Sequence, residues 1–237
     1  METNKIFLTE AYQKSSSAKI IDIGPNGGVV LDQTLFYATS GGQPNDLGQI
    51  TIKGQAKEVK DVRKLGKEGI EIIVEIDKGC VGEHVTQEIN WDRRYKLMKI
   101  HTALHLLSVV IPLPVTGGSM SEEKGRLDFA MPEPLNNKAQ IQDQLNAIIN
   151  QNYQVSDEWI SSEELKRNMN LVKTMSVMPP MDSGKVRLIR IHNSDRTVDL
   201  QPCGGTHVAS TGEIGAVRLG KVENKGRNNR RVNLFLD

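Results

Sequence analysis

Residues 100–107 read Ile-His-Thr-Ala-Leu-His-Leu-Leu near the middle of a 237-residue chain. Apolar residues recur at helical spacing over 91–110 and a proline follows, so we expect one long helix with Asn90 as its N-cap. In that helix His101 and His105 stand at positions i and i+4, and both imidazoles leave the same face. This is the spacing of two ligands to one metal ion.

A second pair of ligand-type residues lies about a hundred positions later, where residues 202–207 read Pro-Cys-Gly-Gly-Thr-His. Cys203 and His207 again stand four apart, but the proline and the two glycines favour a turn. Imidazole and thiolate groups suit tetrahedral zinc better than Mg²⁺ or Ca²⁺, which prefer oxygen. A single histidine is more often an ordinary structural residue, yet two matched pairs favour a zinc site. The pattern leaves open whether that zinc is catalytic or structural.

The composition of the chain limits which binding partners and which cellular compartment we expect. Lys and Arg number 30 against 29 Asp and Glu, a formal net charge of +1, so a nucleic-acid partner must meet a local basic patch. Two cysteines, Cys80 and Cys203, are too few for a disulfide framework and fit a reducing cytoplasm. No apolar run reaches the length of a membrane span, and the N-terminus lacks a signal-peptide core. We therefore expect a cytoplasmic protein without a membrane partner, and we take it to be a monomer.

Short β-branched runs fill the first third of the chain and predict a small β-barrel or sandwich. They cover residues 19–23, 28–31, 49–53, 56–63, 69–76 and 85–89. A glycine-rich segment interrupts them, with the sequence Ser-Gly-Gly-Gln-Pro-Asn-Asp-Leu-Gly at residues 40–48. Its composition fits a plain hairpin connection as well as a loop that closely approaches a substrate.

The rest of the chain mixes helices and strands without regular alternation, which predicts an α+β domain with helices on one face of an antiparallel sheet. After the histidine helix we expect a loop at 115–120, helices at 136–152 and 161–169, and strands at 125–130, 154–160, 186–192, 215–223 and 231–236. We place the domain boundary near residue 88, which gives a β-barrel domain over 1–88 and an α+β domain over 89–237. Residues 221–231 collect five basic residues, a pattern that fits a solvated hairpin tip as well as a phosphate-contacting turn.

An ordered set of motifs carries a resemblance to a known family. The motifs are FYATSGGQPNDLG, HTALHLL, RLDF, CGGTHVASTGEIG and KGRNNRRV. From about residue 28 to the C-terminus, the chain resembles the editing domain of alanyl-tRNA synthetase and the free-standing AlaX-type trans-editing proteins, in particular their medium-length class. The resemblance implies a small β-barrel before a zinc-binding editing domain. It also implies hydrolysis, in trans, of the ester in mischarged tRNA(Ala), chiefly seryl-tRNA(Ala).

The resemblance assigns roles to residues as well. It implies zinc ligands at His101, His105, Cys203 and His207, and a serine-sensing threonine at Thr116, ahead of the RLDF motif. Further expected substrate contacts come from the glycine-rich segment, the loop after the histidine helix and the basic hairpin. They are Gly41, Gly42, Asp46, Ser119, Lys225, Arg230 and Arg231.

The chemistry of such a site follows from its substrates. Serine adds one hydroxyl to alanine, and an apolar synthetic pocket rejects an added hydroxyl by only about a hundredfold, so a second hydrolytic site is useful. Zinc can polarise the ester carbonyl, lower the pKa of a bound water to about 7, or hold the α-amino group, and the sequence leaves these roles open. Zinc peptidases carry a glutamate base directly after the first histidine, where this chain has Thr102. Orientation of the attacking water then falls to Gln43, a backbone group or a ribose hydroxyl.

Other classes share parts of this pattern. A zinc-dependent lyase of the S-ribosylhomocysteine type also begins its helix with His-Thr, but it needs a glutamate where this chain has Leu104. The editing domain of threonyl-tRNA synthetase shares a related His and Cys pattern, and CGGTH rather than a Gly-Pro-His ending favours the alanine system. The alternative function is a tRNA-binding module in which zinc is only structural.

Overall fold

The computed structural model describes residues 2–76, 79–173 and 184–237. The chain forms two compact units. The first combines Met1–Ser40 with Pro44–Tyr95, and the second combines Gly41–Gln43 with Lys96–Asp237. Across the described ranges, no helix has both the length and the apolar character needed to cross a bilayer.

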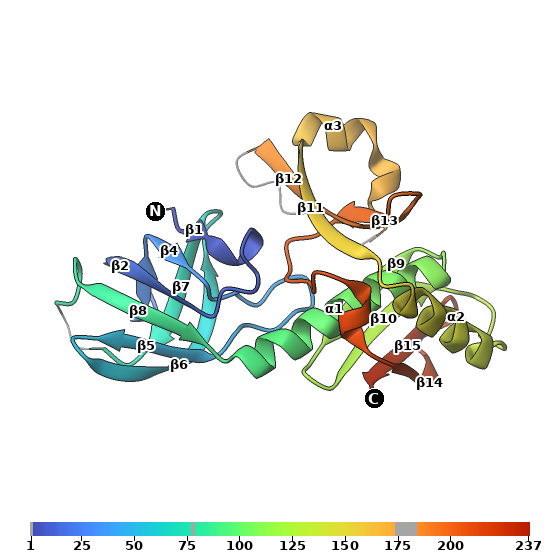
Figure 1. Ribbon diagram of the computed structural model, residues 1–237, viewed down its shortest axis with the longest axis horizontal. Coiled ribbons are helices and arrows are strands. Elements are labelled where there is room, and N and C mark those ends of the chain that lie inside the picture. Colours follow the sequence, from blue (N-terminus) through green and yellow to red (C-terminus); the bar gives the residue numbers. More distant parts are fainter. Residues whose placement is uncertain (1, 77–78, 174–183) are drawn as a thin grey trace. The chain divides into compact units, whose positions relative to one another are not determined.

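The first unit is a closed barrel with the strand order β2-β3-β7-β6-β5-β8, in which every neighbouring pair is antiparallel (Figure 1). Its strands are β2 (Ser15–Ile23), β3 (Val29–Leu31), β5 (Gly48–Ile52), β6 (Gln55–Leu65), β7 (Gly69–Val74) and β8 (His84–Ile89). A short parallel pair, β1 (Asn4–Lys5) with β4 (Gln33–Thr34), and the 3-10 helix η1 (Ile6–Leu8) complete the unit. Buried residues alternate with exposed ones along β8, as period-two patterning requires. The barrel form of the sequence prediction is confirmed.

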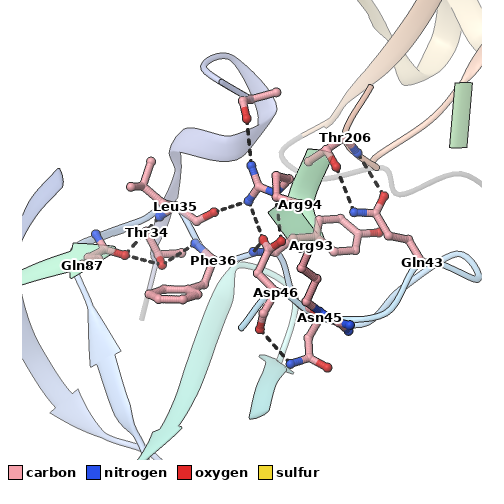
Figure 2. Close-up of polar contacts among 12 residues, drawn as sticks. Thr34, Leu35, Phe36, Gln43, Asn45, Asp46, Gln87, Arg93, Arg94 and Thr206 are labelled. Atoms are coloured by element: carbon pink, nitrogen blue, oxygen red, sulfur yellow. Dashed lines mark hydrogen bonds and ion pairs between the residues drawn. The ribbon is translucent and has the colours of Figure 1, made fainter. Parts of the chain in front are cut away.

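The end of the glycine-rich segment is anchored in the first unit by a buried ion pair. Arg94 and Asp46 are both fully buried; the Arg94 Nε donates to the Asp46 Oδ1 at 2.9 Å, and its Nη2 contacts Oδ2 (Figure 2). The same carboxylate accepts from the Tyr37 backbone N–H at 2.7 Å, and Arg94 also donates to the Leu35 carbonyl at 2.6 Å. A buried charge is stable only when it is paired and hydrogen-bonded in this way. Asp46 therefore holds the loop, whereas the sequence had suggested a contact with substrate.

Helix α1 (Trp91–Val110) carries the first histidine pair. The Asn90 side chain accepts from the Arg93 backbone N–H at 3.1 Å, which confirms the predicted cap. Residues 100–108 are buried throughout, so the helix forms the centre of the second unit rather than a covering layer. On one side it packs against Gly125, where a Cβ would lie within 3.0 Å of the side chains of Ile100 and Leu104. Glycine at that position lets a strand approach the helix closely.

The second unit contains two antiparallel sheets, ordered β14-β15-β10-β9 and β11-β12-β13 (Figure 1). The strands are β9 (Val115–Met120), β10 (Lys124–Ala130), β11 (Gln154–Ser161), β12 (Lys185–His192), β13 (Thr197–Pro202), β14 (Val217–Asn224) and β15 (Asn229–Leu236). Within the described residues, the unit also contains the helices α2 (Lys138–Asn150), α3 (Ser162–Arg167), η2 (Met169–Leu171) and η4 (Thr211–Ile214). The Ser161 hydroxyl caps α3, accepting from the Glu164 N–H at 3.0 Å. The α+β class is confirmed.

Two strands of the second unit, β9 and β13, were not predicted. Residues 115–120 were expected to be a loop, because Thr-Gly-Gly-Ser has little strand propensity, and they form β9. Gly117 and Gly118 pair with Asp128 and Leu127 of β10, so the backbone ladder sets the conformation. A Cβ on Gly118 would lie 3.0 Å from the Leu127 side chain, so the glycine makes room for that leucine.

Candidate metal centre

Four side chains from distant parts of the second unit converge. The ligand atoms of His101 and His105 on α1, and of Cys203 and His207 in the turn after β13, all lie within 4.8 Å of one another. The Cys203 Sγ lies 3.5 Å from the His101 Nε2 and 3.3 Å from the His207 Nε2. Tetrahedral zinc with N and S ligands holds its ligand atoms about 3.5 Å apart. The four residues therefore fit one metal ion.

The surroundings of Cys203 favour its thiolate form. Burial alone would raise the pKa of Cys203, but the neighbouring His101 and His207 outweigh it and hold that pKa well below its ordinary value. The thiolate is the form that binds metals. The cluster is also not sealed, since Cys203 is only partly buried and the three imidazoles keep 5 to 7% exposure.

Gln43 holds the outer nitrogen of His101. The Gln43 Oε1 lies 2.9 Å from the His101 Nδ1 and accepts from the Thr206 backbone N–H at 3.1 Å, while its Nε2 donates to the Thr206 Oγ1 at 2.9 Å. Figure 2 shows this amide facing Thr206. A backbone N–H can only donate, so the oxygen of the amide must face it, and the His101 proton is assigned to Nδ1. Nε2 is then the nitrogen that is free to bind a metal ion.

Thr102 holds the outer nitrogen of His207 by the same logic. Its hydroxyl donates to the Met98 carbonyl at 2.9 Å and lies 3.1 Å from the His207 Nδ1. A hydroxyl carries one proton, so the contact with His207 requires the imidazole to donate from Nδ1. Thr102, in the position of the peptidase glutamate, therefore orients one of the four candidate ligands. Sequence reasoning gave it no role, because the contact joins residues 105 positions apart.

Asp199 on β13 holds the third imidazole. Its Oδ2 lies 3.1 Å from the His105 Nδ1, and a carboxylate can only accept, so His105 also carries its proton on Nδ1. Burial raises the pKa of Asp199, but the hydrogen bond to His105 and the charges of His105 and Lys173 lower it to about 2 overall. All three imidazoles are thus oriented through Nδ1, and such outer partners set the ring orientation and basicity of metal-binding histidines.

The turn that bears the second pair of ligands is fixed by β12. Arg187 is buried, with 8% of the residue exposed, and its guanidinium donates to the Gly205 carbonyl at 2.8 Å and to the Cys203 carbonyl at 3.3 Å. In return, the Cys203 N–H donates to the Arg187 carbonyl at 3.1 Å. These bonds hold the backbone on both sides of Gly204. No sequence signal pointed to Arg187, which looked like one charged residue within a strand.

Comparison with known proteins adds the family. Residues 186–233 match the family described as threonyl and alanyl tRNA synthetase second additional domain, and residues 2–93 match class II (A) tRNA synthetases. The alanyl-tRNA editing protein AlaX-M of Pyrococcus horikoshii is 36% identical over 244 residues, which cover 99% of this chain and 98% of that protein. The chain belongs to the AlaX-M family.

Further relatives agree with this placement. The AlaX-M protein of Methanosarcina acetivorans is 31% identical over 242 residues, 97% of each chain. The alanine-tRNA ligase of Pyrobaculum aerophilum is 34% identical over 233 residues, which are 93% of this chain but 25% of the ligase. This chain therefore aligns along most of its length with one part of a much longer synthetase.

The glycines at positions 41 and 42 bring the glycine-rich segment close to β9. Gly42 has a φ of +84°, and a Cβ there would lie 2.6 Å from the Gly118 carbonyl oxygen. The Met120 N–H donates to the Gly42 carbonyl at 2.9 Å. Gly41 also has a positive φ, of +56°. Both positions favour glycine. Gly42 contacts β9, and the next residue, Gln43, binds the His101 imidazole.

The two predicted residues on β9 lie in a polar environment. The Thr116 hydroxyl lies 3.1 Å from the Asp128 carbonyl oxygen and 3.1 Å from the Asn229 Oδ1. Ser119 is partly buried and pairs with Arg126 of β10. Thr116 is thereby fixed within the sheet, on the strand that contacts Gly42.

The predicted basic residues lie on the hairpin between β14 and β15. Lys225 is exposed at its tip. Arg230 donates to the Gly226 and Pro132 carbonyls, each at 2.8 Å, and Arg231 binds the Asp128 carboxylate through two bonds of 2.8 and 3.0 Å. Burial raises the pKa of Asp128, but the hydrogen bonds from Arg231 and Arg126 lower it overall. These bonds join the hairpin to β10 and the segment after it.

The contact between Thr102 and His207 can be tested by mutation. Replacing Thr102 by Val keeps the shape of the side chain and removes the acceptor for the His207 Nδ1–H. We expect the affinity for zinc to fall about tenfold, as is typical when an outer partner of a metal-binding histidine is lost. Competition with a chromophoric chelator measures it. Thr86→Val, at an exposed position of β8, is the matched control, and equal affinities of the two variants would contradict the assigned role.

Proposed function

We propose that this protein hydrolyses mischarged tRNA(Ala) in trans, chiefly seryl-tRNA(Ala), releasing the amino acid and free tRNA. The observation that carries the proposal is a partly accessible cluster of three imidazoles and one thiolate in a chain that aligns end to end with alanyl-tRNA editing proteins. An aminoacyl-tRNA deacylase of this kind needs an electrophilic centre for an ester. The cluster is suited to supply it with zinc bound.

The reaction is the hydrolysis of an ester. The oxygen of a water molecule bonds to the carbonyl carbon, the bond to the ribose oxygen breaks, and that oxygen takes up a proton. When bound, zinc would supply Lewis acidity at the carbonyl or the water, or a holding point for the α-amino group. The chain's own part is to hold the four ligands and to keep the outer nitrogens of the three imidazoles occupied through Gln43, Thr102 and Asp199. In this proposal Gln43 is a positioning residue for His101 rather than the group that orients water.

Selectivity for serine is proposed to depend on Thr116. A threonine hydroxyl can exchange hydrogen bonds with the serine hydroxyl, which alanine lacks. The position of Thr116 supports this role, because β9 contacts Gly42, and the neighbouring Gln43 bonds His101.

Thr116→Val tests the selectivity. The variant keeps the shape of the side chain and loses its hydroxyl, so the ratio of seryl to alanyl hydrolysis is expected to fall about tenfold, the equivalent of one net hydrogen bond. Single-turnover release from the two charged tRNAs gives the ratio. Thr86→Val again serves as the control, and an unchanged ratio in Thr116→Val would assign discrimination to other groups.

The proposed activity itself is tested with three charged tRNAs. Seryl-tRNA(Ala) should be cleaved at least on the order of a hundredfold faster than alanyl-tRNA(Ala), because a site built to bond a hydroxyl strongly rejects a substrate without one. Seryl-tRNA(Ser) should survive if tRNA(Ala) itself is read. Binding of seryl-tRNA(Ala) without any release of serine would instead support the alternative, a tRNA-binding module with structural zinc.

Finer features of the partner follow from the same proposal. The acceptor stem with its charged 3′ end would meet the basic hairpin, where Lys225 is exposed. All four metal ligands come from one chain, so a monomer is sufficient. Because the proposed substrate is an aminoacylated tRNA, we propose that the protein acts in the cytoplasm.

A further inference from the structure

A line of charged and polar groups leads from the metal cluster to Lys173. The Lys173 Nζ lies 2.5 Å from the Asp199 Oδ1, and the other oxygen of that carboxylate lies 3.1 Å from the His105 Nδ1. The Asp199 side chain is fully buried, whereas 29% of the Lys173 side chain is exposed. The lysine is therefore the outermost member of a three-residue line that ends on a metal ligand.

The carboxylate in this line is held on several sides. The Gln201 Nε2 donates to the Asp199 Oδ2 at 2.7 Å and also lies 3.1 Å from the His105 Nδ1. Each oxygen of Asp199 thus has a separate task, Oδ1 toward the lysine and Oδ2 toward the imidazole. A buried carboxylate is costly without a paired cation, and Lys173 is the lysine or arginine that ion-pairs with it within the described residues.

The backbone of the same residue contacts a different part of the site. The Lys173 carbonyl accepts from the Val115 N–H at 3.1 Å, at the first residue of β9. The next residue of that strand is Thr116, the proposed serine sensor. Lys173 thus joins β9 through its main chain and the metal cluster through its side chain.

We propose that Lys173 and Asp199 are positioning residues of the metal centre: the Lys173 ammonium fixes the Asp199 carboxylate, which holds the His105 imidazole with its Nε2 toward the metal. The inference rests on the proposed zinc site and adds two residues that hold one of its ligands. Neither residue is among the four ligands of the cluster, so both act through His105. Loss of either should weaken zinc binding and leave the four ligands unchanged.

Zinc affinity in four variants tests this line. Asp199→Asn keeps the shape of the side chain and removes its charge, and we expect a loss of affinity of about 10- to 100-fold, while Lys173→Met should lose about tenfold. Because the lysine acts through the carboxylate, the double variant should bind zinc no more weakly than Asp199→Asn alone. Lys166→Met, at an exposed lysine of α3, is the control and should match the wild type.

Cobalt spectra complete the test. The sulfur-to-cobalt charge-transfer band and the ligand-field bands of Lys173→Met and Asp199→Asn should match those of the wild type, since the same three nitrogens and one sulfur bind the ion.

Equal zinc affinity of Lys173→Met and the wild type would overturn the proposal, as would multiplied losses in the double variant or altered ligand-field bands. If Asp199→Asn does not fold, the comparison of Lys173→Met with Lys166→Met still decides. A wild-type protein that binds no zinc would overturn the metal site itself, whereas normal binding with an unaffected Lys173→Met overturns only this inference.

Discussion

Replacing Cys203 by Ala is expected to cost the protein its zinc and its deacylase activity together. The thiolate is the one sulfur ligand in the cluster, and its Sγ lies 3.3 and 3.5 Å from the Nε2 atoms of two imidazoles. Loss of a direct ligand should weaken zinc binding by more than the tenfold to hundredfold that an outer-shell change costs. Hydrolysis of seryl-tRNA(Ala) should fall in parallel, because the same ion serves the reaction.

The second cysteine provides the matched control. Cys80 is buried among the core residues of the first unit, and Cys80→Ala removes the same sulfur atom from a different environment. It should lower the melting temperature modestly and leave zinc affinity unchanged. Wild-type protein and Cys80→Ala should both gain stability on addition of zinc, by about 2.7 kcal/mol at a hundredfold excess over Kd. Cys203→Ala should lose most of that gain, and a full zinc-induced shift in this variant would contradict the ligand assignment.

Gly205→Ala should be nearly as damaging, although it removes no ligand. A Cβ at this position would lie 2.2 Å from the His101 Cε1 and 2.7 Å from the Gln43 Oε1, far inside the 3.5 to 4.0 Å of ordinary contact. Since His101 is buried and bonded on both sides of its ring, it can move away only by leaving the Gln43 oxygen or the metal. We expect zinc affinity to fall by at least tenfold. The metal-free protein should lose about 1 to 3 kcal/mol of folding free energy from overpacking.

Gly117→Ala is the comparison for this glycine. Its Cβ would meet the Asp128 carboxylate at 3.6 Å, an ordinary contact, and its φ lies outside the left-handed region. Zinc affinity measured by chelator competition should therefore be normal in Gly117→Ala and low in Gly205→Ala. Normal affinity in both variants would mean that the turn carrying Cys203 can shift without disturbing His101.

The two pairs of ligand-type residues and the barrel could be predicted from sequence, because each pair and each strand leaves a local pattern. The spacing of His101 and His105 is a helical repeat, and the β-branched runs of the first unit alternate with a period of two. The N-cap residue Asn90 could also be predicted, because its hydrogen bond joins residues only three positions apart. Local patterns of this kind survive in a sequence whatever the rest of the fold does.

The outer shell of the site could not be predicted in the same way. Asp199 and Thr102 meet their histidines across 94 and 105 positions, and neither residue differs in sequence from an ordinary polar side chain. Strand β9 was missed because its glycines are chosen for the space beside Leu127 and Gly42, which depends on the folded chain. Asp46 was assigned to substrate because its motif is glycine-rich, while its burial with Arg94 appears only in three dimensions.

Titration of zinc into chelator-treated protein, with seryl-tRNA(Ala) hydrolysis followed at each addition, tests the account most directly. The four ligands on one chain predict that the single-turnover rate rises in proportion to added zinc and stops rising at one equivalent per chain. Circular dichroism at each point would confirm that the metal-free protein is folded. Full hydrolysis without zinc, or none at one equivalent bound, would contradict a metal centre that serves the deacylation.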